Sequence, residues 1–365
     1  MVAATVPLRV GFIGGGFMGA VHSRAARAAR ASLAGIVSSS AESSSAAAVA
    51  LGIDSAYAST ADLIDDESID VVHIVTPNAT HFELALAALG RGKHVVCEKP
   101  LTTSTADATR LVRVAAEAGV TATVPFVYRF HPMVREARAR VAAGETGTLV
   151  SIQGSYLQDW LLEASDDNWR VAEALGGPSR AFADIGSHLC DMVEFVTGDR
   201  IARLQAITRT VFDERSARTV TTEDLAAVLV EMRSGALGTL LVSQLAPGRK
   251  NRLHFELNGT EESIEFDQEN PELLWLGRRT GSESITRQPG LSADAQRLSV
   301  LPPGHPLGYQ DAFNAFVADT YAAIGGELHD GLPTFDDGLR AVTLTDAVLE
   351  SALTSGWINT PERQS

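Results

Sequence analysis

The chain has 365 residues, of which 45% are hydrophobic and 21% charged, a balance typical of a globular protein rather than a disordered one. Asp and Glu number 45 against 30 for Lys and Arg, so the formal net charge is -15. This charge argues against a nucleic-acid-binding protein, which needs a basic face, and against docking to anionic lipid. Lysine is rare, since only Lys93, Lys99 and Lys250 occur.

The two cysteines, Cys97 and Cys190, are too few for a disulfide framework or a four-thiolate zinc site. We expect both to be small buried hydrophobic residues. No apolar run approaches the roughly 20 residues of a membrane helix, and residues 1–9 show no secretory signal. These features predict a soluble, cytoplasmic protein.

The first third of the chain alternates short apolar runs with helical patterns. Strands are predicted over residues 8–13, 33–37, 71–75 and 93–97, and helices over 20–31, 46–51, 82–89 and 105–118. Strands that alternate with helices at this pace predict an α/β fold, a doubly wound parallel sheet of the Rossmann type. We expect residues 1–125 to form this dinucleotide-binding domain.

After residue 125 the pattern changes to longer runs with β character. These runs cover residues 148–156, 203–212, 226–232, 237–245, 253–258, 260–266 and 273–276. Their alternation of apolar and polar residues predicts a large, mainly antiparallel open sheet. Helices are predicted over 183–197, 310–324 and 337–355, and polar loops over 38–45 and 277–296. We expect residues 126–365 to form an α+β domain for substrate binding and oligomerisation, whose late helices could pack back on the first domain.

A glycine-rich loop follows the first predicted strand directly. Gly14, Gly16 and Gly19 form the G-x-G-x-x-G pattern, with Phe17 and Met18 between them, at the start of a predicted helix. The first glycine permits a tight turn, the second lets the backbone approach a pyrophosphate, and the third allows close packing of helix and strand. Since a helix N-terminus also attracts phosphate, we expect this loop to bind a dinucleotide.

The end of the second predicted strand bears on the choice of coenzyme. An acidic residue that binds the adenosine ribose is usual there, but this chain has Ser38, Ser39 and Ser40. Serine hydroxyls could donate to a 2′-phosphate, or the serines could form a solvated turn. No Arg or Lys flanks them to balance a 2′-phosphate, which favours NAD over NADP without deciding between them.

Two further polar segments follow predicted strands, where ligands bind in open α/β sheets. They are Thr76-Pro77-Asn78, with His81 close behind, and Glu98-Lys99-Pro100. With the glycine loop and the run from Asp184 to Asp191, which matches D-x-G-x-H-x-x-D, they resemble the glucose–fructose oxidoreductase, inositol dehydrogenase and MocA family. The resemblance covers nearly the whole chain, and residues 156–160 look like a segment of its levoglucosan dehydrogenase-like, glycoside-oxidising members.

The resemblance implies both halves of an active site. It implies cofactor contacts at the glycine loop, Ser38, Ser39, Thr76, Pro77, Asn78, His81, Glu98 and Lys99. It also implies that Lys99, Asp184 and His188 converge on the substrate carbon. In that arrangement His188 is the base, Lys99 polarises the oxygen, and Asp184 binds a hydroxyl and orients the others.

The residues themselves support part of this assignment. Asp184 and His188 are spaced i and i+4, so they share one face of a helix. Histidine suits proton abstraction because its ordinary pKa lies near neutrality. The pair could instead be a helix cap with a core histidine, or half of a metal site, but no cysteine–histidine cluster completes a coordination shell and we expect no metal.

A sugar or polyol needs hydrogen-bonding partners and an apolar surface for its C–H groups. The candidates are Tyr128, Arg129, Gln158, Trp160, Arg170 and His305. Trp160 is equally compatible with a core position. His305 lies in a proline-rich turn ahead of a predicted helix.

These observations predict an NAD(P)-dependent oxidoreductase that acts on a secondary hydroxyl of a sugar, glycoside, anhydrosugar or cyclitol. A glycosidase that uses nicotinamide for transient oxidation is an alternative, and so is a cofactor-binding regulator without catalysis. One face of the predicted sheet lacks a cover of helices, and with the resemblance this predicts a homodimer or homotetramer. The exact substrate, the carbon oxidised and the direction of reaction are left open.

Overall fold

The computed structural model describes residues 7–361. The prediction that residues 1–9 carry no secretory signal therefore falls mostly outside the described residues, since residues 1–6 are not among them. The chain divides into two units, of which the first combines residues up to Val127 with Tyr309–Leu339. The second unit combines Tyr128–Gly308 with the residues from Arg340 onward. The second domain predicted over residues 126–365 is therefore interrupted by a segment of the first unit.

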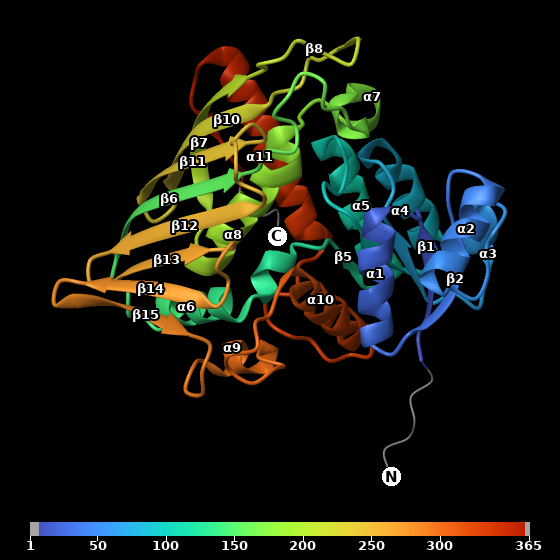
Figure 1. Cartoon of the computed structure of the whole chain (residues 1–365), viewed down its shortest axis with the longest axis horizontal. Helices are drawn as coiled ribbons and strands as arrows, with labels where there is room; N and C mark the ends of the chain where they lie inside the picture. The colour runs from blue at the N-terminus through green and yellow to red at the C-terminus, as the bar shows by residue number, and fades with distance from the viewer. Residues whose placement is uncertain (1–6, 362–365) are drawn as a thin grey trace. The chain divides into compact units, whose positions relative to one another are not determined.

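The first unit is built on a parallel sheet, as predicted, and this sheet has five strands, of which β5 was not predicted (Figure 1). Its strand order is β2-β1-β3-β4-β5. The chain adds β2 on one side of β1 and then β3, β4 and β5 on the other side, so the order in which strands are added reverses between β1 and β3. The strands are β1 (Arg9–Ile13), β2 (Ser32–Val37), β3 (Val71–Ile74), β4 (His94–Cys97) and β5 (Ala122–Thr123). The helices are α1 (Phe17–Ala28), α2 (Ala41–Leu51), α3 (Thr60–Asp65), α4 (His81–Gly90), α5 (Thr105–Ala118) and α10 (Tyr309–Ile324). β3 and β4 are buried almost throughout, as expected of strands covered on both faces.

Helix α2 corrects the prediction of a polar loop over residues 38–45. It begins at Ala41, because the Ser40 side chain accepts the Ser43 N–H at 3.1 Å and the Ser43 side chain accepts the Ser40 N–H at 2.9 Å. This reciprocal cap turns serines that favour loops into a helix start. The short helix α3 was also not predicted.

Helix α10 joins the first unit although it lies near the end of the sequence. It packs beside α1, where the rings of His22 and Phe313 have centroids 4.6 Å apart. The Gln310 side-chain amide donates to the backbone carbonyl of Val21 at 3.2 Å. These contacts explain why the segment 309–339 belongs to this unit.

The second unit contains a nine-stranded sheet of order β15-β14-β13-β12-β6-β11-β10-β7-β16. Every pair is antiparallel except β6 and β11, which confirms the prediction of a mainly antiparallel sheet. The strands are β6 (Leu149–Leu157), β7 (Ile201–Arg209), β10 (Leu225–Met232), β11 (Leu237–Ser243), β12 (Arg252–Gly259), β13 (Ser263–Asp267), β14 (Leu273–Arg278), β15 (Gly281–Thr286) and β16 (Ile358–Asn359). A separate hairpin pairs β8 (Glu214–Arg215) with β9 (Arg218–Thr219).

Helices cover one face of this sheet (Figure 1). They are α6 (Pro132–Ala142), α8 (Ser187–Thr197) and the part of α11 (Phe335–Thr354) that lies in the second unit, and the shorter α7 (Glu173–Gly176) and α9 (Ala293–Leu298) complete the unit. Gly154 lets α8 approach β6 closely, since a Cβ there would lie 3.0 Å from Leu189. In β10 buried residues alternate with more exposed ones, so the strand has one covered face.

Two further predictions need correction in this unit. Residues 277–296, predicted as a loop, contain β15 and the start of α9. The strand was missed because a polar edge strand lacks the apolar alternation that marks a half-buried strand. The helix predicted over 183–197 is a π-helical turn, Phe182–Gly186, followed by α8. Within residues 7–361, no helix combines the length and the hydropathy that crossing a bilayer requires.

Candidate active site

The glycine loop lies at the carboxyl end of β1, beside the point where the strand order reverses. Gly14 has φ +113°, and a Cβ there would lie 2.7 Å from the Val75 carbonyl oxygen. A Cβ at Gly19 would lie 2.7 Å from the Gly14 carbonyl oxygen. Both positions therefore require glycine, as the fingerprint predicts.

Gly16 differs, because a Cβ there would meet no described protein atom within 4 Å. Its backbone faces open space at the N-terminus of α1, whose first turn holds no acidic residue among those described. Phe17 is next in the chain and its side chain is 74% exposed, unusual for a large apolar group. Open space and a positive helix end together fit a dinucleotide pyrophosphate.

The predicted coenzyme-selecting serines lie between β2 and α2. Ser38 donates its backbone N–H to Ser44 Oγ at 2.8 Å, and its hydroxyl oxygen would lie 3.5 Å from a Cβ built at Gly15. Ser38 thus adjoins the glycine loop. Glu42 follows in the first turn of α2, where its own backbone N–H and the Ser40 hydroxyl lower the pKa of its carboxyl.

Buried His81 joins the two polar segments that follow β3 and β4. Its Nδ1 lies 2.8 Å from the Pro100 carbonyl oxygen, and its Nε2 lies 2.9 Å from that of Thr76. Burial lowers the pKa of His81, while hydrogen bonds to the two carbonyls oppose the shift. His81 therefore holds these segments together, and its direct contact with a cofactor stays a prediction. Pro77 and Asn78 lie in the same segment, where Asn78 is buried.

The three lysines have different surroundings. Lys93 is buried and its Nζ donates to the Asp66 and Ile69 carbonyls at 2.8 and 2.7 Å. Lys250 is exposed and pairs with Asp159 at 2.7 Å. Lys99 is half-buried at the carboxyl end of β4, and its backbone N–H donates to Glu98 Oε2 at 3.1 Å. Only Lys99 follows a strand of the first unit at the end that carries the glycine loop.

In the second unit, Asp184 lies in the π-helical turn and His188 in the first turn of α8. Gly186 separates them, and a Cβ there would lie 2.5 Å from the buried Phe182 ring. π-turns of this kind are frequent at functional sites. The close packing explains why the D-x-G-x-H stretch needs glycine at its centre.

The Asp184 carboxylate is held by two side chains from other segments. Gln244 Nε2 donates to Oδ2 at 3.0 Å, and Arg170 Nε lies 3.3 Å from Oδ1. Arg170 also lies over the Trp169 ring at 4.3 Å. Arg170 was predicted to bind substrate, and the structure pairs it with Asp184.

His188 packs among tyrosines. The Tyr128 ring meets it edge-on at 5.0 Å, and the Tyr156 ring lies at 6.3 Å. His188 is 7% exposed and the two tyrosines are buried. Burial raises the pKa of Tyr128 and the charge of Asp184 raises it further, against hydrogen bonds from Tyr156 and Asn251.

A network of hydroxyl and amide groups connects these tyrosines, and it is centred on Asn251. Asn251 Nδ2 donates to Tyr128 Oη at 3.0 Å, while Asn251 Oδ1 accepts from Tyr156 Oη at 2.7 Å and from Gln158 Nε2 at 2.8 Å. The two tyrosine hydroxyls are 2.6 Å apart. The Trp160 indole N–H donates to Gln158 Oε1 at 2.8 Å. Gln158 and Trp160 thus support the network, and their direct contact with substrate stays a prediction.

Two predicted substrate contacts have partners outside this network. Arg129 forms a buried ion pair with Asp191 and lies over the Phe195 ring at 4.9 Å, so its guanidinium is bound within the protein. His305 is exposed in its proline-rich turn, where its carbonyl accepts Arg287 Nη2 at 2.7 Å. For both residues a contact with substrate stays a prediction.

Sequence reasoning missed Asn251 and Gln244. Gln244 follows β11 and Asn251 precedes β12, while Gln158 follows β6. Leu157 pairs with Ser243 and with Arg252, so the three polar residues meet at one end of adjacent strands. Polar residues at strand ends could have pointed to Asn251 and Gln244. Recognising that these strand ends lie together requires the order of the strands in the sheet, which the sequence does not reveal.

Comparison with known proteins places these features in one family. Residues 8–126 match the family described as "Oxidoreductase family, NAD-binding Rossmann fold", and residues 134–265 match "GFO/IDH/MocA C-terminal domain". The chain belongs to the GFO/IDH/MocA oxidoreductase family. The resemblance found in the motifs is thereby confirmed, and the chain is an NAD(P)-dependent oxidoreductase.

Relatives of this oxidoreductase cover nearly its whole length. Levoglucosan dehydrogenase of Pseudarthrobacter phenanthrenivorans is 30% identical over 97% of this chain and 98% of its own. An oxidoreductase domain protein from Kribbella flavida has a TM-score of 0.92 at 35% identity, covering 98% of this chain and 100% of that one. A levoglucosan dehydrogenase solved with NADH and levoglucosan has a TM-score of 0.91 at 30% identity, with the same coverage.

Proposed function

We propose that this oxidoreductase moves a hydride between nicotinamide and a secondary hydroxyl or ketone of a sugar, anhydrosugar, glycoside or cyclitol. The observation that carries the proposal is His188 packed on Tyr128, with Asp184 held by Gln244 and Arg170 on the same helical segment. Such polar groups around a buried imidazole suit a polyhydroxylated ligand. The relatives' names favour anhydrosugars within this class.

Each proposed catalytic residue has a separate task. His188 accepts the hydroxyl proton while the C–H hydrogen leaves with its electron pair as hydride, which nicotinamide accepts when bound. Lys99 stabilises the alkoxide that develops on the same oxygen. Asp184 binds a neighbouring hydroxyl, and Arg170 and Gln244 fix the direction of its carboxylate. The backbone N–H groups of the glycine loop would hold the pyrophosphate of a bound dinucleotide.

We propose NAD as the preferred coenzyme. Ser38 and Ser39 offer hydroxyls but no positive charge, and Glu42 adds a negative charge nearby in the chain. A 2′-phosphate would meet repulsion there without a basic partner. The test is the ratio of kcat/KM for NAD to that for NADP, which we expect to exceed tenfold and to fall in Glu42→Arg.

Absorbance of reduced nicotinamide across a panel of sugars, anhydrosugars and cyclitols tests the proposed reaction. Lys99→Met and His188→Gln should each lower kcat roughly a hundredfold or more. Lys250→Met is the matched control, because Lys250 is an exposed lysine with an ion-pair partner. Full activity in both variants would refute the assigned roles. Sugar release without net reduction would favour the glycosidase, and cofactor binding without turnover on any substrate would favour a regulator.

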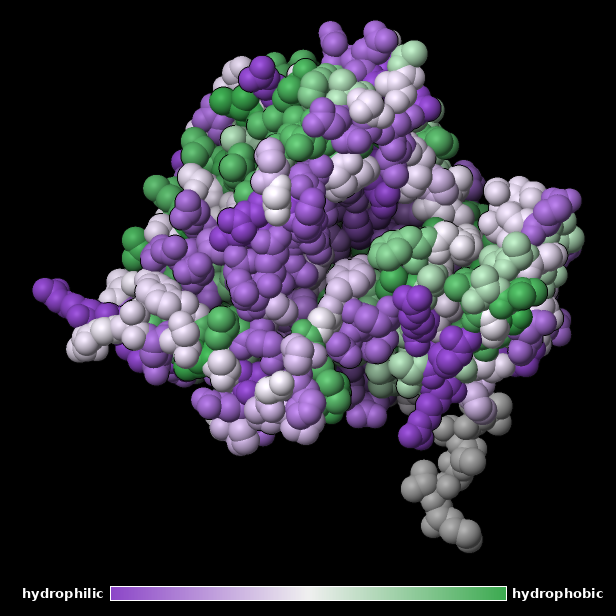
Figure 2. Space-filling model, viewed as in Figure 1, coloured by the Kyte–Doolittle hydropathy of each residue, from purple (hydrophilic) through white to green (hydrophobic). Residues whose placement is uncertain are grey.

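We also propose that a second copy of the chain covers the open face of the nine-stranded sheet. Hydrophobic residues gather over β7, β10 and β11 (Figure 2), and Ile207, Leu229 and Leu241 are 75%, 48% and 43% exposed. A cavity of about 730 Å³ lies on this face. An isologous contact would bury these side chains. Light scattering should show a dimer or tetramer that dissociates in Leu229→Asp, and a monomeric wild type would refute this proposal.

A further inference from the structure

A continuous chain of buried hydrogen bonds begins at Glu98, next to Lys99. Glu98 Oε1 lies 3.0 Å from His22 Nε2, and His22 Nδ1 lies 2.8 Å from His73 Nδ1. His73 Nε2 lies 2.9 Å from the Tyr321 hydroxyl. The four residues come from the end of β4, from α1, from β3 and from α10, all within the first unit.

The surroundings exclude water and fix the two imidazole rings. His22 and His73 are both 0% exposed. The His22 ring packs on Phe313 at 4.6 Å, the His73 ring packs on Phe12 at 5.2 Å, and the two imidazoles meet edge-on at 5.1 Å. Since buried polar groups without partners are costly, the chain must satisfy each of its nitrogens internally.

The proton positions follow from the contacts. Burial lowers the pKa of His73 well below its ordinary value, so this ring is neutral and carries one N–H. His22 carries an N–H on Nε2 in either protonation state, because a lone pair there would face the Glu98 carboxylate. With a neutral His22, His73 Nδ1–H donates to His22 Nδ1, and the Tyr321 O–H donates to His73 Nε2. In that arrangement every donor points from Tyr321 toward Glu98.

We propose that His22, His73 and Tyr321 are positioning residues that orient the Glu98 carboxylate for catalysis at Lys99. Glu98 Oε1 receives the His22 N–H, and Oε2 receives the Lys99 backbone N–H at 3.1 Å. His22 lies three residues beyond Gly19 on α1, so the same helix carries the cofactor loop and the anchor for the Lys99 segment. The inference rests on the proposed role of Lys99 in the reaction.

Paired variants of His22 test this assignment. A Gln side chain can place an amide N–H where His22 Nε2 lies, whereas Leu cannot. We expect His22→Leu to lower kcat roughly tenfold or more, because misplacing a group near the reacting atoms is costly, while the sugar KM stays within about twofold. His22→Gln should recover most of kcat. Tyr321→Phe, which removes only the far donor, should lower kcat by a smaller factor.

His94→Gln is the matched control, since His94 lies at the opposite end of β4 and its Nδ1 accepts the Thr121 N–H. It should keep wild-type kcat. Equal losses in His22→Gln and His22→Leu, or no loss in either, would overturn the proposal. If Lys99→Met were fully active, the proposed function would fail first; if Lys99→Met were inactive and His22→Leu active, only the positioning role would fail.

A measurement on the wild-type protein covers the case in which a variant fails to fold. In protein labelled with ¹⁵N-histidine, NMR should show the N–H of His22 on Nε2 and that of His73 on Nδ1. The contacts of the His22 ring with Phe313 and of the His73 ring with Phe12 assign the two signals in the wild-type protein. The reverse tautomers would overturn the chain of donors.

Discussion

Glu223 Oε1 accepts the backbone N–H of Phe182 at 2.8 Å, from 41 residues further along the chain. The same oxygen accepts the Ser179 hydroxyl at 2.7 Å and the Arg180 N–H at 3.1 Å. Phe182 opens the π-helical turn that carries Asp184. A carboxylate at this place satisfies N–H groups that lack helical partners and complements the helix dipole. The turn that presents Asp184 is therefore capped by a distant residue.

Replacing Glu223 should lower both stability and activity. Glu223 is 4% exposed, and we expect Glu223→Ala to lower the free energy of unfolding by about 2 kcal/mol, measured by urea denaturation. Its kcat should also fall, because the turn with Asp184 loses its cap. Glu223→Gln keeps an acceptor oxygen and should lose less. Glu214→Ala, an exposed control, should change stability by less than about 0.5 kcal/mol, and an equal loss there would contradict the capping role.

The contact between Glu223 and Phe182 is of a kind that the sequence alone does not reveal, whereas local patterns in the site could be predicted. The glycine loop, Glu98-Lys99-Pro100 and the Asp184–His188 pair are local patterns, because each feature is set by residues within a few positions of one another. Glu223, Gln244 and Asn251 act on residues 41, 60 and 123 positions away, so their roles depend on which strands become neighbours. Periodicity predicts that strands exist, but not their order in a sheet.

Local chemistry explains the missed elements as well. The helix start at Ala41 depends on a hydrogen-bond exchange between Ser40 and Ser43, residues that also occur in loops. β15 is almost entirely exposed and pairs only with β14 among the described strands, so its sequence carries no buried face to detect. The core strands were predictable because buried positions are occupied by apolar residues, which leave a pattern in the sequence. Edge strands and helix caps depend on single polar contacts, which leave no such pattern.

Substitution of Asn251 should lower stability and also weaken substrate binding. Asn251→Ala leaves the Tyr128 and Tyr156 hydroxyls and the Gln158 amide each without one partner. Since an unpaired buried polar group is costly, we expect a loss of about 1–3 kcal/mol in unfolding free energy, with a raised sugar KM. Arg249→Ala, two residues earlier and on an exposed ion pair, is the control. An unchanged sugar KM in Asn251→Ala would argue against a binding site beside these tyrosines.

The pair formed by Tyr57 and Asp66 predicts a dependence of stability on pH. The Tyr57 hydroxyl and the Ser68 groups lower the pKa of Asp66 from 3.8 to about 2, so this stabilisation is present at neutral pH and is lost as pH falls through that range. Burial and Asp66 raise the pKa of Tyr57 from 10.0 to about 12, so stability is also lost as pH rises between these values. Tyr57→Phe should flatten both slopes in plots of unfolding free energy against pH.

The matched variant is Asp66→Asn, which should flatten the acidic slope more than Tyr57→Phe does, because it also removes the effect of the Ser68 hydrogen bonds on the pKa of this carboxyl. The double variant should match Asp66→Asn in that range, because no carboxyl remains for Tyr57 to act on. An acidic slope that persists unchanged in Asp66→Asn would mean that other carboxyl groups produce it.

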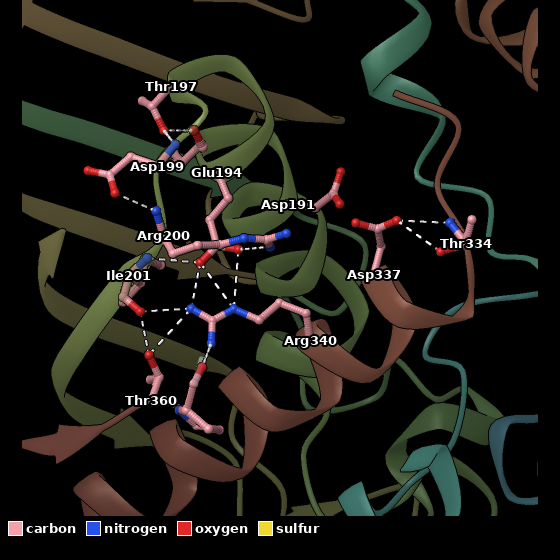
Figure 3. A network of polar contacts seen from close by, with 12 residues as sticks. Asp191, Glu194, Thr197, Asp199, Arg200, Ile201, Thr334, Asp337, Arg340 and Thr360 are labelled. Atoms are coloured by element: carbon pink, nitrogen blue, oxygen red, sulfur yellow. Dashed lines mark hydrogen bonds and ion pairs between the residues drawn. The ribbon is translucent and has the colours of Figure 1, made fainter. Parts of the chain in front are cut away.

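A buried carboxylate holds the C-terminal strand to the end of α8 (Figure 3). Glu194 Oε1 accepts Arg340 Nη2 at 2.6 Å and the Ile201 N–H at 2.9 Å, and Oε2 lies 2.5 Å from Arg200 Nη1. Arg340 also donates to the Ile201 carbonyl at 2.7 Å and to the Pro361 carbonyl at 3.1 Å. The guanidinium therefore joins α8, β7 and the segment that contains β16.

Arg340→Ala should destabilise the protein more than Arg200→Ala. Without Arg340 the carboxylate keeps one cation but stays buried, so we expect a loss of about 2–3 kcal/mol, against about 1 kcal/mol for the more exposed Arg200. Arg340→Lys keeps the charge but cannot form the forked contact, and it should fall between them. Hydrogen exchange should rise first at Ile358 and Asn359, because β16 loses its anchor before the central strands open. Equal exchange across the sheet would show instead that Arg340 stabilises the unit as a whole.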